Sequence, residues 1–171
     1  MEQLVTAAVI VAAGNSTRMG QPKQLLPLAG KPVLAHTLKA FQQCDVIKEI
    51  VVVARQEDVD AFAALAEEWT ITKMKAIVPG GDTRQQSVAA GVAACSPDVA
   101  LLAIHDGARP LVHPEDIVRT VKAASECGGA TLAVPVKDTI KLADDGGYIS
   151  HTPERSRLWS IQTPQVFRRE V

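Results

Sequence analysis

Four short apolar runs, rich in Val, Ile and Ala, set the strongest limit on how this chain can fold. They cover residues 5–11, 50–54, 99–104 and 130–136. Continuous apolar runs of this length are typical of strands that are covered on both faces, as in a parallel sheet. The segments between them carry apolar residues at helical spacing, namely Leu34, Leu38 and Phe41; Val59, Phe62, Leu65 and Trp69; Ile117, Val118 and Val121. Strands that alternate with helices predict βαβ units and an α/β fold.

Several residues mark where these helices begin and end. Asp82, followed three residues later by Gln85, predicts a helix start of the capping-box kind. Pro114 suits the first turn of the next helix, and Glu115 beside it suits the helix dipole. The pair Gly128-Gly129 then predicts the end of that helix.

The pattern changes after residue 136. Residues 138–142 and 147–151 flank the turn sequence Asp144-Asp-Gly-Gly147, which predicts a β-hairpin. Both strands are poorer in large apolar residues than the sheet strands. We therefore expect the hairpin to project as an arm over residues 137–156 rather than join the core.

Composition narrows the class of protein. The 171 residues include 18 Lys and Arg against 19 Asp and Glu, and 47% are apolar, so one domain over residues 1–171 can form a sizeable core. The chain lacks a long basic run, which argues against a nucleic-acid or membrane-surface partner. It begins without a basic segment and has no apolar stretch of about 18 residues, so the sequence predicts neither signal peptide nor membrane span and favours a cytoplasmic location. Three scattered cysteines fit reduced thiols rather than a zinc site.

The loop after the first strand is the first candidate site. Residues 12–24 combine small residues with Arg18 and Lys23, at the edge of the sheet where α/β folds bind ligands. Gly14 and Gly20 leave backbone N–H groups approachable for a phosphate. The spacing matches neither a dinucleotide fingerprint nor a Walker A loop. An ordinary loop with two solvated cations is the alternative reading.

A second candidate site is His105-Asp-Gly-Ala-Arg-Pro110, directly after a buried strand. Asp106 could hold Mg²⁺ against phosphate oxygens, and Arg109 could pair with another phosphate. The alternative is that Asp106 caps a turn and that Arg109 lies on the surface.

Five motifs in order resemble one known family. They are the loop at 12–24, Gly80-Gly-Asp-Thr-Arg-Gln-Gln-Ser87, His105-Asp-Gly-Ala-Arg-Pro110, Val136-Lys-Asp-Thr-Ile-Lys141 and Trp159-Ser-Ile-Gln-Thr-Pro-Gln-Val-Phe167. Together they resemble the 2-C-methyl-D-erythritol 4-phosphate cytidylyltransferases of non-mevalonate isoprenoid biosynthesis. The resemblance implies a Rossmann-like three-layer α/β/α nucleotidyltransferase fold with a mostly parallel sheet. It also implies an enzyme that joins CTP and methylerythritol phosphate to give 4-diphosphocytidyl-2-C-methyl-D-erythritol and pyrophosphate.

The resemblance also implies roles for individual residues. Arg18 and Lys23 would stabilise charge on the α-phosphate in the transition state. The nucleotide would be contacted by Ala12, Ala13, Gly14, Gly81, Asp82 and Ser87. The substrate phosphate and its metal would be held by Asp106, Arg109, Thr139 and Arg155, with Asp106 as the Mg²⁺ ligand. Thr139 and Arg155 lie on the arm, which in this family reaches the partner subunit of a homodimer.

The chemistry implied by the resemblance needs few protein groups. A substrate phosphate is already anionic near neutral pH, so it can attack without a dedicated general base. His105 and His113 are therefore expected to be structural. Family members continue for several tens of residues beyond position 171, and we expect an additional basic residue that positions the substrate to lie there.

The sequence leaves three other interpretations open. Molybdenum-cofactor cytidylyltransferases share a similar opening, including a stretch like Pro22-Lys-Gln-Leu-Leu-Pro-Leu28. Ribitol-phosphate cytidylyltransferases share more of the motifs, because both substrates are small polyol phosphates. A nucleotide-binding module without catalysis is the third possibility.

Overall fold

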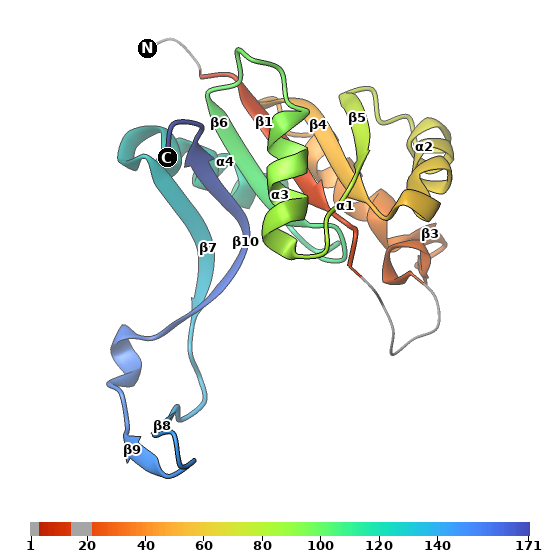
Figure 1. The fold of residues 1–171 in the computed structure, drawn as a ribbon. Helices are drawn as coiled ribbons and strands as arrows, with labels where there is room; N and C mark the ends of the chain where they lie inside the picture. Colours follow the sequence, from red (N-terminus) through yellow and green to blue (C-terminus); the bar gives the residue numbers. More distant parts are fainter. Residues whose placement is uncertain (1–3, 15–21) are drawn as a thin grey trace.

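A six-stranded sheet forms the centre of the computed structural model, which describes residues 4–14 and 22–171 (Figure 1). The strand order is β5-β4-β1-β6-β10-β7. The strands are β1 (Thr6–Val11), β4 (Ile47–Ala54), β5 (Met74–Pro79), β6 (Leu101–Asp106), β7 (Gly129–Pro135) and β10 (Trp159–Arg168). Adjacent strands from β5 to β6 are parallel, whereas β10 runs antiparallel to both β6 and β7. The predicted mostly parallel α/β sheet is confirmed.

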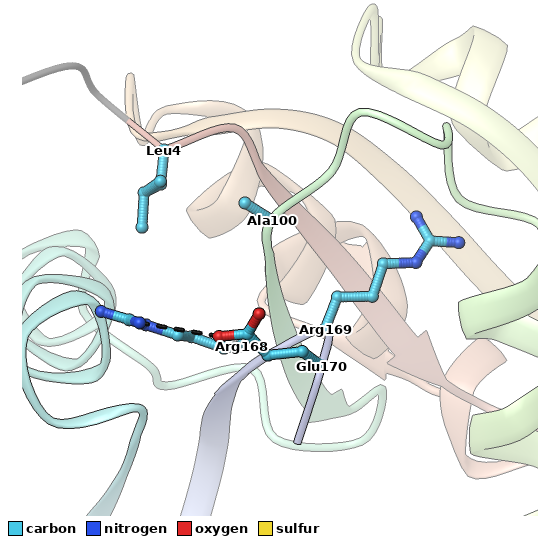
Figure 2. A pocket seen from close by; sticks show the side chains of 5 residues that line it. All are labelled: Leu4, Ala100, Arg168, Arg169 and Glu170. Atoms are coloured by element: carbon cyan, nitrogen blue, oxygen red, sulfur yellow. Dashed lines mark ion pairs between the residues drawn. The ribbon is translucent and has the colours of Figure 1, made fainter.

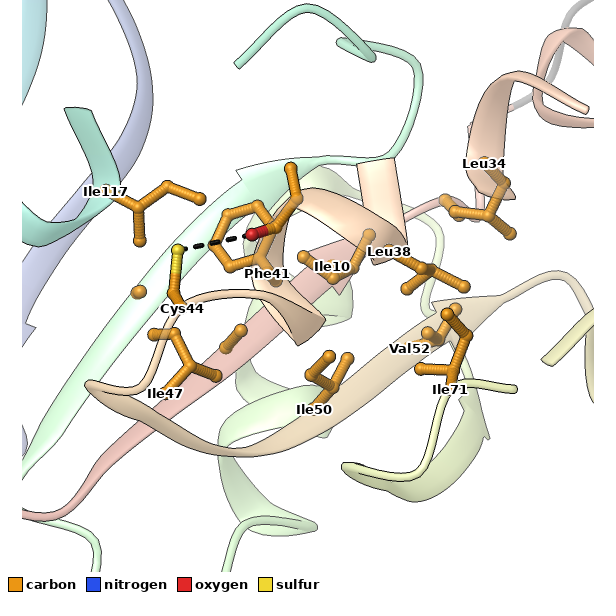
Figure 3. Close-up of a cluster of buried hydrophobic side chains, with 14 of the residues drawn as sticks. Ile10, Leu34, Leu38, Phe41, Cys44, Ile47, Ile50, Val52, Ile71 and Ile117 are labelled. Carbon is orange, nitrogen blue, oxygen red and sulfur yellow. Dashed lines mark hydrogen bonds between the residues drawn. The ribbon is translucent and has the colours of Figure 1, made fainter. Parts of the chain in front are cut away.

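Helices cover both faces of this sheet. They are α1 (Val33–Gln42), α2 (Val59–Glu68), α3 (Arg84–Ala93) and α4 (Pro114–Cys127). Alternate residues of β1 point to opposite sides: Ile10 packs with α1, α2 and α4, whereas Val9 packs with α3. Figure 3 shows the larger cluster, where Phe41 lies beside Ile10. The result is the predicted three-layer α/β/α arrangement.

Short elements fill the connections between these layers. They are η1 (Lys23–Leu25), β2 (Pro27–Leu28), β3 (Lys31–Pro32), η2 (Gln56–Asp58), β8 (Leu142–Ala143), β9 (Ile149–His151) and η3 (Arg155–Arg157). Within the two described ranges, no helix combines the length and the apolar character needed to cross a membrane.

The sequence predicted the boundaries of α4 correctly but misplaced the start of α3. Helix α4 begins at Pro114 and ends at Cys127, and Gly128 caps it with a left-handed φ of 85°, as the sequence predicts. The capping box of α3 was predicted one residue too early, because the structure forms it between Thr83 and Gln86. The Thr83 hydroxyl accepts a hydrogen bond from the Gln86 backbone, and the Gln86 side chain accepts one from the Thr83 backbone.

The far edge of the sheet departs from the sequence prediction. Strand β7 was expected to be covered on both faces, but it is the edge strand and Val134 is 45% exposed. Periodicity did not indicate β10, which inserts between β6 and β7. Residues 168–171 end β10 and form a turn.

The predicted arm is present. Strands β8 and β9 pair as a small antiparallel hairpin that projects from the ends of β7 and β10 (Figure 1). Asp144 closes its turn by accepting hydrogen bonds from the backbone N–H groups of Gly146 and Tyr148. Tyr148 is 77% exposed and Ile149 is 66% exposed, so the arm carries apolar side chains that the described chain leaves uncovered.

Candidate active site

Backbone hydrogen bonds align the loops at the carboxyl edge of the parallel strands. The N–H of Ala12, after β1, donates to Val53 O at 2.7 Å. The N–H of Gly80, after β5, donates to Ala54 O at 2.8 Å, and the N–H of Gly107, after β6, donates to Val11 O at 2.8 Å. Three loops therefore leave the sheet side by side, where open α/β sheets bind their ligands.

A cavity of about 710 Å³ lies between these loops. Its lining comes from the ends of β1, β4, β5 and β6, from η1 and from the start of α3. The lining residues are Val11, Ala13, Gly14, Gln24, Arg55, Gln56, Glu57, Gly80, Gly81, Asp82, Thr83, Arg84, Ser87, Asp106 and Ala108. The cavity therefore brings the first three sequence motifs together in one place, and its size suits a small organic ligand.

The loop after β1 contributes two of its predicted contacts to the cavity. Ala13 and Gly14 line it, whereas both backbone groups of Ala12 are already bonded within the protein. The carbonyl of Ala12 accepts a 2.9 Å hydrogen bond from Nε2 of buried Gln24, which ties the beginning of the loop to its end. Arg18 lies outside the described residues, and Lys23 lies on η1 beside Gln24.

The turn between β5 and α3 needs its first glycine for close packing. A Cβ added to Gly80 would lie 2.6 Å from Ala13 Cβ and 2.7 Å from Ser87 Oγ, both too close. The N–H of Gly81 donates to Oγ of buried Ser87 at 3.2 Å. The structure thus brings Gly81 and Ser87 into contact, and Asp82 lines the same cavity.

Asp106 lies at the end of β6 between two arginines. Its Oδ1 accepts a 3.1 Å hydrogen bond from Arg84 Nη2, and its Oδ2 accepts a 3.0 Å hydrogen bond from Arg109 Nε. Burial by itself raises the pKa of Asp106, but the hydrogen bonds from Arg109 and Arg84 outweigh it and leave that pKa below its ordinary value. The carboxylate is therefore anionic near neutral pH, and Arg109 is ion-paired rather than free on the surface.

His105 is fully buried behind this carboxylate. Its Nε2 lies 3.2 Å from the Arg109 carbonyl, which can only accept, so Nε2 carries the proton and Nδ1 accepts from the Thr163 hydroxyl at 2.9 Å. The same hydroxyl oxygen accepts a hydrogen bond from the Asp106 N–H at 3.3 Å. Burial lowers the pKa of His105 to about 4, so the ring is neutral near pH 7. Its geometry fits the structural role expected for it.

The donor set can be compared with what Mg²⁺ requires. No group of three or more His, Cys, Asp or Glu residues suited to a metal occurs among residues 4–14 and 22–171. Magnesium is commonly held by one or two carboxylates together with substrate phosphates. Asp106, whose side chain is 32% exposed beside the cavity, fits such a shared site but not a cage built by the protein alone.

Two predicted substrate residues lie elsewhere in the described chain. Thr139 and Arg155 lie on the arm, and neither lines the cavity. Both are exposed, and Arg155 Nη1 donates to Lys137 O at 3.2 Å. This chain therefore does not bring them to its own cavity.

The structure also adds cavity residues that the sequence motifs did not single out. Arg55 follows β4 and is held by Asp58 at 2.6 Å and by Glu57 at 2.9 Å. Arg84 lies inside the motif at residues 80–87, but the sequence by itself indicates no role for its side chain. Arg55 directly follows the apolar run at residues 50–54, and this position at the end of a predicted strand could have indicated a cavity residue.

A second hollow, of about 510 Å³, lies at the opposite edge of the sheet (Figure 2). Leu4, Ala100, Arg168, Arg169 and Glu170 line it. Arg169 is directed to the Ser96 carbonyl at 2.6 Å, and Arg168 pairs with Glu170 at 3.6 Å. This hollow lies near the amino ends of β1 and β6, whereas ligands of α/β sheets bind at the carboxyl ends.

The fold and the cavity define a class of protein. The chain is an α/β protein with a glycine-lined pocket at the carboxyl edge of its parallel strands and an Arg-Asp-Arg cluster beside that pocket. This is the architecture of enzymes that act on nucleotides and phosphates. Comparison with known proteins is more specific. The family model for 2-C-methyl-D-erythritol 4-phosphate cytidylyltransferase matches residues 6–171. The chain belongs to this family.

Individual relatives agree with this assignment. The chain is 46% identical to the 2-C-methyl-D-erythritol 4-phosphate cytidylyltransferase of Pelotomaculum thermopropionicum, over 96% of this chain and 71% of that protein. It is 48% identical to the same enzyme of Caldanaerobacter subterraneus subsp. tengcongensis, over 96% of this chain and 74% of that protein. Among solved structures, 4-diphosphocytidyl-2C-methyl-D-erythritol synthase of Anaerococcus prevotii matches with a TM-score of 0.88 and 32% identity, over 98% of this chain and 71% of that one.

Proposed function

We propose that this chain transfers a cytidylyl group from CTP to 2-C-methyl-D-erythritol 4-phosphate and releases pyrophosphate. The observation that carries the proposal is the cavity itself, where the loop after β1, the Gly80-Gly81 turn and Asp106 meet in a chain of this family. These are the parts needed to hold a nucleotide beside a second phosphate. The family match favours this reaction over the alternatives with molybdenum cofactor or ribitol phosphate.

The nucleotide side of the cavity supports base selection. The N–H of Gly81 donates a hydrogen bond to Ser87 Oγ, and Asp82 lines the same cavity. These three residues therefore place backbone and side-chain polar groups where we propose that the base binds. A site that hydrogen-bonds the cytosine edge leaves polar groups unpaired when it meets uracil. We therefore assign Ala13, Gly14, Gly81, Asp82 and Ser87 to the nucleotide.

The reaction on this site requires positioning and charge stabilisation rather than a proton relay. The phosphate of the polyol is anionic near neutral pH and attacks the α-phosphorus in line with the departing pyrophosphate. Lys23, with Arg18, stabilises the negative charge that develops on the α-phosphate. Neutral His105 keeps the backbone between Asp106 and Arg109 in place and exchanges no proton.

Magnesium belongs to this proposal as a cofactor shared with the substrates. Asp106 would hold it together with phosphate oxygens, and the metal would offset the charge of the triphosphate. Arg109, on the other oxygen of Asp106, would bind the phosphate of the polyol.

A homodimer through the arm completes the proposed site. Thr139 and Arg155 lie on the arm, and the described lining of their own cavity does not include them, so we assign them to the cavity of a partner. The uncovered apolar side chains of the arm, such as Tyr148 and Ile149, support a second copy as their cover.

A substrate matrix tests the proposal. CTP, UTP, ATP and GTP are each combined with methylerythritol phosphate and with ribitol phosphate, with Mg²⁺ present, and the products are identified by mass spectrometry. We expect one efficient pair, CTP with methylerythritol phosphate. Equal turnover of CTP and UTP would contradict the base assignment, and preferred turnover of ribitol phosphate would contradict the proposed second substrate.

A further inference from the structure

Arg84 lines the cavity, and the proposed reaction assigns it no role. It is the first residue of α3, which begins just beyond β5, and its side chain reaches Asp106 at the end of β6. In the sheet, β4 and β1 separate β5 from β6. The Arg84–Asp106 ion pair therefore connects two sides of the cavity that the sheet holds apart.

The contact with Asp106 uses only part of the hydrogen-bonding capacity of the Arg84 guanidinium. Arg84 Nη2 and Nε both approach the same oxygen, Asp106 Oδ1, at 3.1 and 3.4 Å, while Arg109 occupies Oδ2. A guanidinium binds most strongly when two parallel N–H groups meet two oxygens, as on a phosphate. Across the described ranges, Asp106 is the only acceptor recorded for the Arg84 side chain. Its donors are therefore better suited to a phosphate than to this shared carboxylate.

The charge balance of the cluster points the same way. Arg84 and Arg109 bring two positive charges to the single negative charge of Asp106. The Arg84 side chain is 51% exposed, and exposed ion pairs of this kind are weak. The cluster therefore has a positive charge in excess, on a side chain that can change partner at little cost, directly beside the turn that forms the base pocket.

We propose that Arg84 binds a phosphate group of the nucleotide, exchanging Oδ1 of Asp106 for phosphate oxygens. The exchange would also leave that carboxylate oxygen available to the second substrate or its metal. The inference rests on the proposed function for the identity of the nucleotide, CTP. It gives the nucleotide phosphates a cation on α3, in addition to Arg18 and Lys23, which the proposed reaction assigns to the α-phosphate.

Binding of CTP and of cytidine separates a phosphate contact from damage to the base pocket. Both ligands are titrated into wild-type protein and Arg84→Met without the polyol phosphate, by calorimetry for CTP and by ligand-observed NMR for cytidine. We expect Arg84→Met to weaken CTP binding about 10-fold or more and to change cytidine binding by less than about twofold. Arg84→Lys, which keeps the charge but loses the fork, should show a smaller loss for CTP.

Arg119→Met is the matched control, because Arg119 forms an equivalent ion pair with Asp116 on α4, outside the cavity, and should leave both affinities unchanged. The assignment is overturned if Arg84→Met binds CTP as the wild type does, or if it loses cytidine and CTP affinity equally. Wild-type protein that prefers another triphosphate would instead contradict the proposed function. The same comparison, made with that triphosphate and its nucleoside, would then decide the role of Arg84.

Discussion

Asp106 shows how one side chain can be fixed by its neighbours before any ligand is considered. Two guanidinium groups hold its two oxygens, and together they keep the pKa of the carboxyl below its ordinary value despite partial burial. Asn has nearly the same shape as Asp but carries no charge. We expect Asp106→Asn to lower kcat/KM for the polyol phosphate about 100-fold, because charge-assisted hydrogen bonds on both oxygens are lost.

The control for this variant is Asp116→Asn. Asp116 Oδ1 forms an ion pair with Arg119 Nη2 at 2.7 Å. Its side chain is 33% exposed, close to the 32% of Asp106, but it does not line the cavity of about 710 Å³. Steady-state kinetics on both variants make the comparison. An Asp106→Asn enzyme as active as Asp116→Asn would remove the carboxylate from the reaction.

His105 makes stability depend on pH. Its folded-state pKa is about 4, because burial disfavours the charged ring, whereas the pKa of an unfolded histidine is about 6.5. Between these values the unfolded chain binds a proton that the folded chain does not. Stability is therefore complete above pH 6.5 and falls as the pH drops toward 4. We expect His105 to account for a loss of about 2–3 kcal/mol by pH 4.5.

Urea unfolding of the wild type and of His105→Gln between pH 7 and 4.5 measures this contribution. The variant is expected to be less stable at pH 7, because it loses buried hydrogen bonds to Thr163 and to the Arg109 carbonyl. Its stability should nevertheless change less with pH than that of the wild type. Parallel pH curves for the two proteins would mean that folding does not lower the pKa of His105.

At the scale of elements, the apolar pattern predicted the centre of the molecule well. The run at 50–54 became part of β4, and helical spacing placed Phe41 and Phe62 in the core. Elements buried on one or both sides leave a clear apolar period, since every inward position must be apolar. Glycine and proline then fixed the boundaries of α4, because their backbone preferences are local.

The same reasoning could not reach the edge of the sheet or the ion pairs of the site. Strand β10 is stabilised by pairing with β6 and β7, which lie far from it in the sequence, and Trp159 and Ile161 on it remain exposed. Its sequence therefore lacks the apolar period of a buried strand. The contact of Arg84 with Asp106 joins residues 22 positions apart and follows only from the order of the strands.

Helix α3 gives a prediction that opposes helix propensity. Gly91 is buried in it, and a Cβ at this position would lie 2.8 Å from Val53 Cγ2 and even closer to Val9 Cγ1. Ala favours a helix over Gly by about 1 kcal/mol, but overpacking against two branched sheet residues costs about 1–3 kcal/mol. We expect Gly91→Ala to be less stable than the wild type by about 1 kcal/mol, measured by thermal or urea unfolding.

Ala89→Gly on the exposed side of the same helix is the control. It should lose about 1 kcal/mol from propensity alone. If Gly91→Ala unfolds at a higher temperature than the wild type, the close approach of α3 to β1 and β4 is looser than the structure indicates.

At the scale of the whole molecule, the arm is the part with the fewest stabilising contacts of its own. It is a two-stranded hairpin, and isolated hairpins are marginally stable in water. Leu142, Tyr148 and Ile149 on it are 46%, 77% and 66% exposed. A two-fold axis that brings a second arm against the first would bury these side chains and carry Arg155 toward the cavity of the partner.

Complementation between inactive variants tests whether the two subunits share a site. Lys23→Ala and Arg155→Ala should each be inactive or nearly so, because each removes one cation from the proposed site. In a mixed dimer, one cavity would combine intact Lys23 from one chain with intact Arg155 from the other. We expect activity to return on mixing, once subunit exchange has been verified by mass spectrometry of differently tagged chains.

The pair Lys23→Ala with Asp106→Asn provides the control, because the proposed reaction assigns both residues to the cavity of the same chain. Every cavity of that mixed dimer lacks one of the two groups, so activity should stay low. Exchange without recovery in the first pair would place Arg155 in its own chain's site or remove it from substrate binding. Recovery in both pairs would mean that Lys23 and Asp106 serve different cavities, contrary to the proposed reaction.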